Sequence, residues 1–191
     1  MASGRTHVAL LRGINVGGKN KLPMKELAAL FAAEGCESVE TYIQSGNVLF
    51  SLPPTRAKGL SARIPAAIRR RFGFEVPVVI RSGEELTTVP DRNPFLAHSV
   101  ASGHAAGLAA LHVAFLAEAP GEAERVSLDP GRSPPDAFAV VGREVYLHLP
   151  NGVARTKLTN AYLDRQLRTV STLRNWNTVL KLIELMEIRS K

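Results

Sequence analysis

The chain has 191 residues, of which 45% are hydrophobic and 21% charged, an ordinary globular composition that predicts a packed core in one large domain or two small ones. Its single cysteine, Cys36, excludes an intrachain disulfide. The first apolar run is shorter than the hydrophobic region of a signal peptide, and no apolar run approaches the roughly 20 residues of a membrane span. We therefore expect a soluble, cytoplasmic protein with no membrane partner. The net charge of +7 permits a phosphate-rich partner through electrostatic attraction without requiring one.

The first half of the sequence predicts the element order β-α-β-β-α-β. Pro23 suits the first position of a helix, and Gly35 suits its end. Pro65 lies inside a second helical pattern and therefore starts or kinks the regular helix. In chain order, we expect a strand over 7–14, a helix over 23–35, a hairpin over 39–50, a helix around Pro65, a strand over 76–80 and a short helix over 84–89.

The second half repeats this order after a connecting segment, residues 91–110. Apolar strand-like runs again flank a turn to form a hairpin, and helical patterns precede and follow it. In chain order, we expect a strand over 111–116, a short helix over 121–126, a hairpin over 138–149, a helix over 158–167, a short strand over 170–172 and a last helix over 175–188.

The repeated order predicts an α+β fold of two ferredoxin-like (βαββαβ) halves packed as one unit, with mainly antiparallel sheets and helices on one face. The predicted halves are residues 1–90 and 111–191, joined by 91–110, and the second half has an extra C-terminal helix. The halves share negligible sequence identity. One larger sheet with a coincidental repeat is therefore the alternative.

The topology of the first half also predicts which loops meet. Strands 1 and 2 of a βαββαβ unit run the same way, so the loop after strand 1 and the hairpin after strand 2 emerge at one edge. Glycines there allow a ligand close to the backbone, and Lys, Arg, Asn and Gln offer charge and hydrogen bonds, which suits a phosphate, sugar or base. The alternative is that such residues are simply common in turns. The predicted ligand-binding residues of this first set are Arg12, Asn15, Gly17, Gly18, Lys19, Asn20, Gln44, Ser45 and Asn47, with Lys21 beside them.

In the second half, the loops that follow strands 3 and 4 emerge at a common edge of the sheet. Two helices begin there, and helix N-termini attract anions. Alternatively, Asn175 or Asn177 caps the last helix and Trp176 belongs to the core. Whether the two sets face one another depends on how the halves pack. The predicted ligand-binding residues of this second set are Arg155, Lys157, Asn160, Arg174, Asn175 and Asn177, with Thr156 beside them.

Residues 13–20 nearly match the phosphate-binding loop pattern G-x-x-x-x-G-K-[ST]. Asn20 stands where a hydroxyl should hold Mg²⁺, the helix starts late at Pro23, and the next element is a hairpin. No apolar strand ending in Asp follows at a plausible distance to hold the metal. An NTPase is therefore disfavoured, and backbone capture of an anion by Gly17 and Gly18 is the weaker hypothesis that remains.

Other catalytic chemistry has little support in the sequence. The histidines do not have metal-ligand spacing, and neither loop set contains a carboxylate, which disfavours a metal-dependent nuclease or a two-carboxylate hydrolase. Ser45 has no obvious histidine partner, and the helix end before Cys36 raises its thiol pKa. We therefore expect no metal and no cofactor, and we assign no catalytic residue.

Several of these segments resemble the bacterial family catalogued as domain of unknown function 1697. The resemblance spans essentially the whole chain and implies an α+β architecture with ferredoxin-like subdomains, but no activity. Thr156 stands where the family usually has serine, and it keeps the hydroxyl. The resemblance adds weight to Arg12, Asn15, Lys19, Gln44, Asn47, Lys157, Arg174 and Asn177 as a site. The matching segments are residues 9–24, 42–48, 72–78, 93–95, 156–160 and 172–178.

Three functional hypotheses follow. The first is a protein that binds a phosphate-bearing ligand, either a nucleotide or single-stranded nucleic acid. Ferredoxin-like sheets bind RNA by stacking bases on aromatic side chains, but aromatic residues are only 6% here, so a small nucleotide is favoured equally. The second is a metal-independent enzyme acting on a phosphorylated or nucleotide substrate through Arg and Lys. The third is a protein-interaction module, and an oligomer is compatible with all three.

Overall fold

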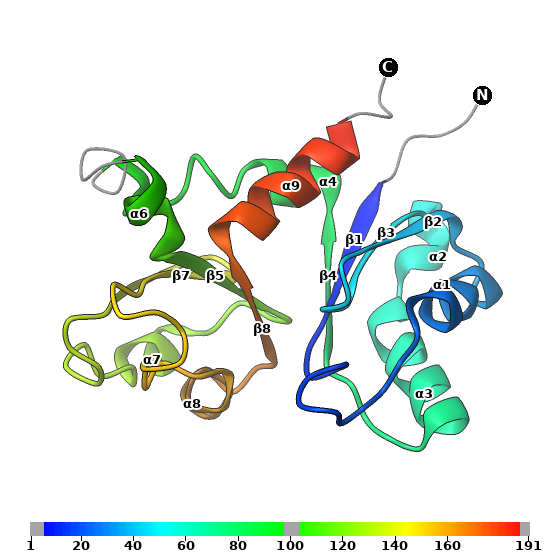
Figure 1. Cartoon of the computed structure of the whole chain (residues 1–191), viewed down its shortest axis with the longest axis horizontal. Coiled ribbons are helices and arrows are strands. Elements are labelled where there is room, and N and C mark those ends of the chain that lie inside the picture. The colour runs from blue at the N-terminus through cyan, green and yellow to red at the C-terminus, as the bar shows by residue number, and fades with distance from the viewer. Residues whose placement is uncertain (1–5, 98–103, 188–191) are drawn as a thin grey trace. The chain divides into compact units, whose positions relative to one another are not determined.

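The computed structural model describes residues 6–97 and 104–187. The chain divides into two compact units, one made of Met1–Thr87 with Leu182–Lys191 and the other of Thr88–Lys181 (Figure 1). The last helix, α9 (Trp176–Glu187), runs across this division. The predicted boundaries at residues 90 and 111 stay predictions.

The first unit contains a four-stranded antiparallel sheet in the order β2-β3-β1-β4. Two longer helices lie on the same side of this sheet (Figure 1). The elements are β1 (His7–Leu11), α1 (Met24–Ala33), β2 (Glu37–Tyr42), β3 (Asn47–Ser51), α2 (Pro54–Ala57), α3 (Leu60–Phe72), β4 (Val78–Ser82) and α4 (Gly83–Thr87).

The second unit repeats this topology, with strands in the equivalent order β6-β7-β5-β8 and every pair antiparallel. The recurrence confirms the predicted α+β fold with two ferredoxin-like halves. The elements are α6 (His104–Ala109), β5 (Leu111–Leu116), α7 (Glu122–Val126), β6 (Ala137–Val141), β7 (Glu144–His148), α8 (Asn160–Leu167) and β8 (Ser171–Asn175), followed by α9.

The first hydrophobic core lies between the sheet and helices α1 and α3. Ala9 and Leu11 of β1 point toward the helices, which contribute side chains such as Phe31 and Ile68. Each fully buried side chain of this size contributes about 1.5–3 kcal/mol through removal of apolar surface from water. Val8 and Leu10, on the opposite face of β1, are also fully buried. Burial on both faces accounts for the uninterrupted apolar sequence of this strand.

Three element boundaries differ from the sequence prediction. Strand β1 ends at Leu11 rather than residue 14, because Gly13 adopts a positive φ of 76° and turns the chain. Helix α3 begins at Leu60, well before Pro65, since one proline removes only one backbone N–H donor from a helix that is otherwise packed on the core. Strand β8 extends to Asn175 rather than residue 172.

Gly46 is the position where added side-chain volume should be most harmful. Its φ is +82°, and a Cβ there would lie 2.7 Å from Leu11 Cβ and 3.0 Å from Ile14 Cδ1. We predict that Gly46→Ala destabilises the protein by roughly 3 kcal/mol or more, the sum of left-handed strain and overpacking. Urea-induced unfolding followed by circular dichroism measures this loss.

Gly13→Ala is the matched control, because Gly13 has a similar φ of +76° and no atom within 4 Å of the added Cβ. It should lose only about 1–2 kcal/mol, the strain term alone. Equal losses in the two variants would contradict the close packing of Gly46 against Leu11 and Ile14.

Candidate functional site

The loop after β1 is a short hairpin of its own. Val16 and Lys19 form an isolated antiparallel bridge, and Lys19 N donates to Val16 O at 3.1 Å. Gly17 and Gly18 between them have φ values of 59° and 74°, as a type I′ turn requires. Helix α1 starts only at Met24. The loop therefore differs in geometry from the phosphate-binding loop of NTPases. This agrees with the sequence, which disfavoured an NTPase.

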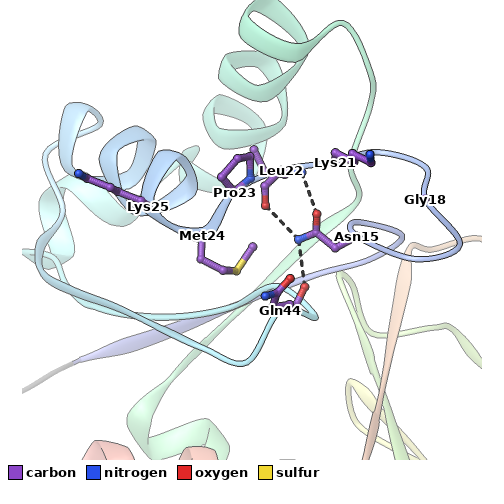
Figure 2. Close-up of a pocket in the computed structure, with 8 residues that line it drawn as sticks. All are labelled: Asn15, Gly18, Lys21, Leu22, Pro23, Met24, Lys25 and Gln44. Atoms are coloured by element: carbon purple, nitrogen blue, oxygen red, sulfur yellow. Dashed lines mark hydrogen bonds between the residues drawn. The ribbon is translucent and has the colours of Figure 1, made fainter.

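The side chain of Asn15 connects this loop to two other segments through hydrogen bonds (Figure 2). Its Nδ2 donates to Leu22 O at 2.9 Å and to Gln44 O at 3.1 Å, while its Oδ1 accepts from Leu22 N at 2.8 Å. Leu11 N also donates to Gly46 O at 2.8 Å. The loop after β1 and the β2–β3 hairpin thus meet at one edge of the sheet, which confirms the predicted convergence.

A pocket of about 610 Å³ lies beside Asn15. In Figure 2, Lys25 lies to one side of Met24 and Lys21 to the other, and the side-chain nitrogens of both lysines point outward. The pocket combines positive charge, a side-chain amide and apolar surface. It is lined by Asn15, Gly18, Lys21, Leu22, Pro23, Met24, Lys25 and Gln44.

The N-terminus of α1 borders this pocket without a side-chain cap. The first hydrogen bond of the helix is Leu27 N to Pro23 O at 3.0 Å, so the N–H groups of the preceding first turn have no acceptor within the helix. These groups and the helix dipole attract anions.

The charges around the pocket are predominantly positive. Lys21 and Lys25 are exposed, and neither forms an ion pair with any residue in the described part of the chain. Glu26, in the first turn of α1, is paired with Arg71. Its charge is therefore partly neutralised, and the lysines remain available for a ligand.

Three residues of the first predicted set line the pocket, namely Asn15, Gly18 and Gln44. Asn20 and Asn47 are outside the lining and hydrogen-bond to the loops around them. Asn20 Nδ2 donates to Gly13 O at 2.9 Å, and the fully buried Asn47 donates to Tyr42 O at 3.1 Å and Ser45 Oγ at 3.0 Å.

The remaining members of the first set lie outside the pocket lining. Arg12 is half-buried and its backbone N–H donates to Pro77 O at 3.1 Å. Gly17 and Lys19 are exposed on the hairpin tip. Four lining residues at or just before the start of α1 were not predicted from the sequence, although the predicted helix start at Pro23 could have indicated them. They are Leu22, Pro23, Met24 and Lys25.

The register of the second sheet brings the ends of β7 and β8 to one edge, as predicted, but Asn160 of the second predicted set lies at the opposite edge. Lys157 N donates to Ser133 Oγ at 2.9 Å, beside the segment that leads into β6. Asn160 Oδ1 accepts from Ser171 Oγ at 2.9 Å, at the opposite end of β8 from Asn175.

Other members of the second set have structural roles. The Oγ1 of buried Thr156 accepts from Leu158 N at 3.0 Å, whereas Arg155 is exposed. Asn175 Oδ1 accepts from Thr178 N at 2.8 Å and caps α9, and Trp176 is buried, so both alternatives noted for this segment are confirmed. Asn177 is exposed on α9.

Arg174 is buried in β8, and its Nη1 donates to Leu173 O at 2.8 Å. Burial lowers the pKa of its guanidinium to about 10, so the group remains protonated at neutral pH. It is thus a buried charge within a strand and not part of an exposed loop.

The described residues do not suggest metal or thiol chemistry. Among them, no cluster of three or more His, Cys, Asp or Glu side chains is arranged to hold a metal ion. Burial raises the pKa of the Cys36 thiol to about 11, so desolvation rather than a helix dipole is the main cause. Within residues 6–97 and 104–187, no helix has the length and apolar character to span a membrane.

Asn15→Ala should loosen the whole edge of the sheet. The variant loses the three side-chain hydrogen bonds to Leu22 and Gln44 and places alanine at a φ of 55°. We predict a loss of about 2–3 kcal/mol in the free energy of unfolding, measured with urea.

Asn177→Ala is the control, because this exposed asparagine forms no hydrogen bond with a described residue. Its effect should stay within about 0.5 kcal/mol. A similarly small effect of Asn15→Ala would show that the loop does not depend on this side chain.

Comparisons with known proteins agree with the fold. The conserved bacterial protein SP0830 from Streptococcus pneumoniae aligns with a TM-score of 0.69 and 23% sequence identity, over 96% of this chain and 99% of that chain. At this identity the likeness shows the fold alone. No curated protein matches the chain. A family model matches residues 5–146, and the chain belongs to that family, described as protein of unknown function DUF1697.

Proposed function

We propose that this protein binds a phosphate-bearing ligand, a nucleotide or a single-stranded nucleic acid, in the pocket beside Asn15. The observation that carries the proposal is the uncapped N-terminus of α1, which borders a pocket lined by Lys21 and Lys25. Neither lysine forms an ion pair with a residue that the structure describes. Backbone N–H groups at a helix start and lysine ammonium groups are both donors that suit phosphate oxygens.

The magnitudes favour a specific anion site over general attraction. A hydrogen bond to a charged group contributes about 1.5–3 kcal/mol, against a few tenths for a screened surface charge. One such bond from α1 and one from a lysine would together contribute about 3–6 kcal/mol, which corresponds to a Kd between several millimolar and tens of micromolar. Salt should weaken this binding, because both lysines are exposed.

The lining supports binding more than catalysis. Its charged groups, Lys21 and Lys25, are cations, and Gln44 adds an amide. None of the described lining residues is Asp, Glu, His or Cys, the side chains that most often act as general acid or base. The enzyme and interaction-module hypotheses have no comparable observation in their favour.

Thermal unfolding tests the proposal. The purified protein is melted with inorganic phosphate, nucleoside monophosphates, and short single-stranded RNA and DNA, at low and high salt. A ligand at a hundred times its Kd stabilises by about 2.7 kcal/mol, which raises the Tm by roughly 5–10 °C. The shift should shrink at high salt and in Lys21→Ala and Lys25→Ala.

Lys157→Ala is the matched control, because it removes the same charge from an exposed lysine in the second unit. This variant should keep the full shift. Equal loss in all three variants would point to nonspecific attraction by net charge, and no shift with any probe would overturn the proposal.

A further inference from the structure

We infer that two copies of this chain pair through strand β6, so that the four-stranded sheets of their second units join into one continuous antiparallel sheet. The inference does not depend on the phosphate pocket, whose lining belongs to the first unit. It follows from the open edge of β6, from its uncharged sequence and from the symmetry of that sequence about Ala139.

The backbone of β6 directs part of its hydrogen-bonding groups outward. Among the described strands, β6 pairs with β7 alone. Leu116 N donates to Arg143 O, so Arg143, just before β7, bonds toward β5. Because bonding alternates along an antiparallel ladder, the even-numbered residues of β7 bond to residues 137, 139 and 141 of β6. The N–H and C=O groups of Phe138 and Val140 consequently point away from β7.

These outward groups are available for another strand. Within residues 6–97 and 104–187, no hydrogen bond joins Phe138 or Val140 to a residue outside the β6–β7 ladder. All five residues of β6 are also partly exposed. An unpaired row of donors and acceptors at the edge of a sheet is a template for pairing with a further strand.

The helix side of β6 is incompletely covered. Helix α7 has five residues and buries none of them, whereas the equivalent helix α1 has ten and buries Leu27 and Phe31. Phe138 and Val140 pack against the second core and yet remain partly exposed. A strand added to this edge would cover apolar surface that α7 leaves in contact with water.

The equivalent edge of the first unit is protected against such pairing. Strand β2 contains Glu37 and Glu40, its register shifts between them, and Ser38 there has a φ of 50°. Charged side chains and bulges are features that keep natural edge strands from pairing. Strand β6 is Ala-Phe-Ala-Val-Val, and its register with β7 runs without a shift. The contrast marks β6 as the edge that is suited to pairing.

A second copy of β6 matches this edge. When two β6 strands run antiparallel with Ala139 opposite Ala139, Phe138 of each copy lies opposite Val140 of the other. Both pairs then exchange two hydrogen bonds, which satisfies every outward group of these residues. An aromatic side chain opposite a β-branched one is a favourable cross-strand pair, and both side chains lie on the helix side of the sheet.

The charge pattern also selects self-pairing. A strand that pairs with its own copy brings identical residues close together, and like charges directly opposite one another are destabilising. No residue of β6 is charged, and in this register Asp136 lies opposite Gly142 of the second copy. Self-pairing of β2 would instead bring glutamates together.

We expect a weak dimer, because one pair of short strands is smaller than the roughly 1,200–2,000 Å² of a stable interface. Sedimentation velocity between about 10 µM and 1 mM covers the affinity range of such contacts. The sedimentation coefficient should rise with concentration. High salt should strengthen the dimer by screening the net charge of +7, whereas it should weaken phosphate binding.

Two variants at the centre of the pairing, Ala139→Lys and Ala139→Glu, provide the decisive comparison. Each should weaken dimerisation at least about tenfold, because it places like charges opposite one another. An equimolar mixture of the two should dimerise again, since Lys then faces Glu. A misfolded variant would not be rescued in this way, and circular dichroism verifies folding. Thr41→Lys on β2 is the control and should dimerise like the original chain.

Amide hydrogen exchange followed by NMR locates the contact. The N–H groups of Phe138 and Val140 should exchange more slowly as the protein concentration rises, whereas that of Ala139, already bonded to β7, should not change. A dimer that neither charged variant weakens, or a mixture that stays monomeric, would overturn the inference. A chain that remains monomeric up to about 1 mM would also overturn it and leave an extended segment of another protein as the occupant of this edge.

Discussion

The three hydrogen bonds of the Asn15 side chain are the constraint on which the candidate site depends. They join the loop after β1 to Leu22, just before helix α1, and to Gln44 in the β2–β3 hairpin. Leu22 is fully buried, so these bonds hold in place the segment that leads into α1, while Phe31 packs the helix itself on the core. The first turn of α1 has no side-chain cap, and Met24 and Lys25 of that turn line the pocket.

The two halves share a topology but not a site. Arg81 in β4 and Arg174 in β8 hold equivalent strand positions, both are buried, and each donates Nη1 to the preceding carbonyl. The segment after β5 leads into the short helix α7 and contains no counterpart of the Gly17–Gly18 hairpin. A repeated framework therefore preserves the buried strand arginine, while the loop that forms the pocket belongs to the first unit alone.

Periodicity and turn chemistry were sufficient to predict the element order and the meeting of loops at the edge near Asn15, because both depend on local patterns and on strand direction. They did not predict that Asn15, Asn20 and Asn47 use their amides to support the backbone, since an asparagine that binds a ligand and one that braces a turn look alike in sequence. Arg174 was assigned to a loop because β8 was predicted too short. Lys25 was missed because the predicted helix start at Pro23 was not considered together with the loop that precedes it.

Amide chemical-shift mapping by NMR can show whether the Asn15-anchored loop and the start of α1 form one anion site. The protein is labelled with ¹⁵N and titrated with adenosine 5′-monophosphate. We predict that the largest shifts occur at the backbone amides of the α1 first turn and of Gly17 and Gly18, together with the Gln44 side chain. Saturable shifts confined to the second unit, or no shifts at all, would contradict it.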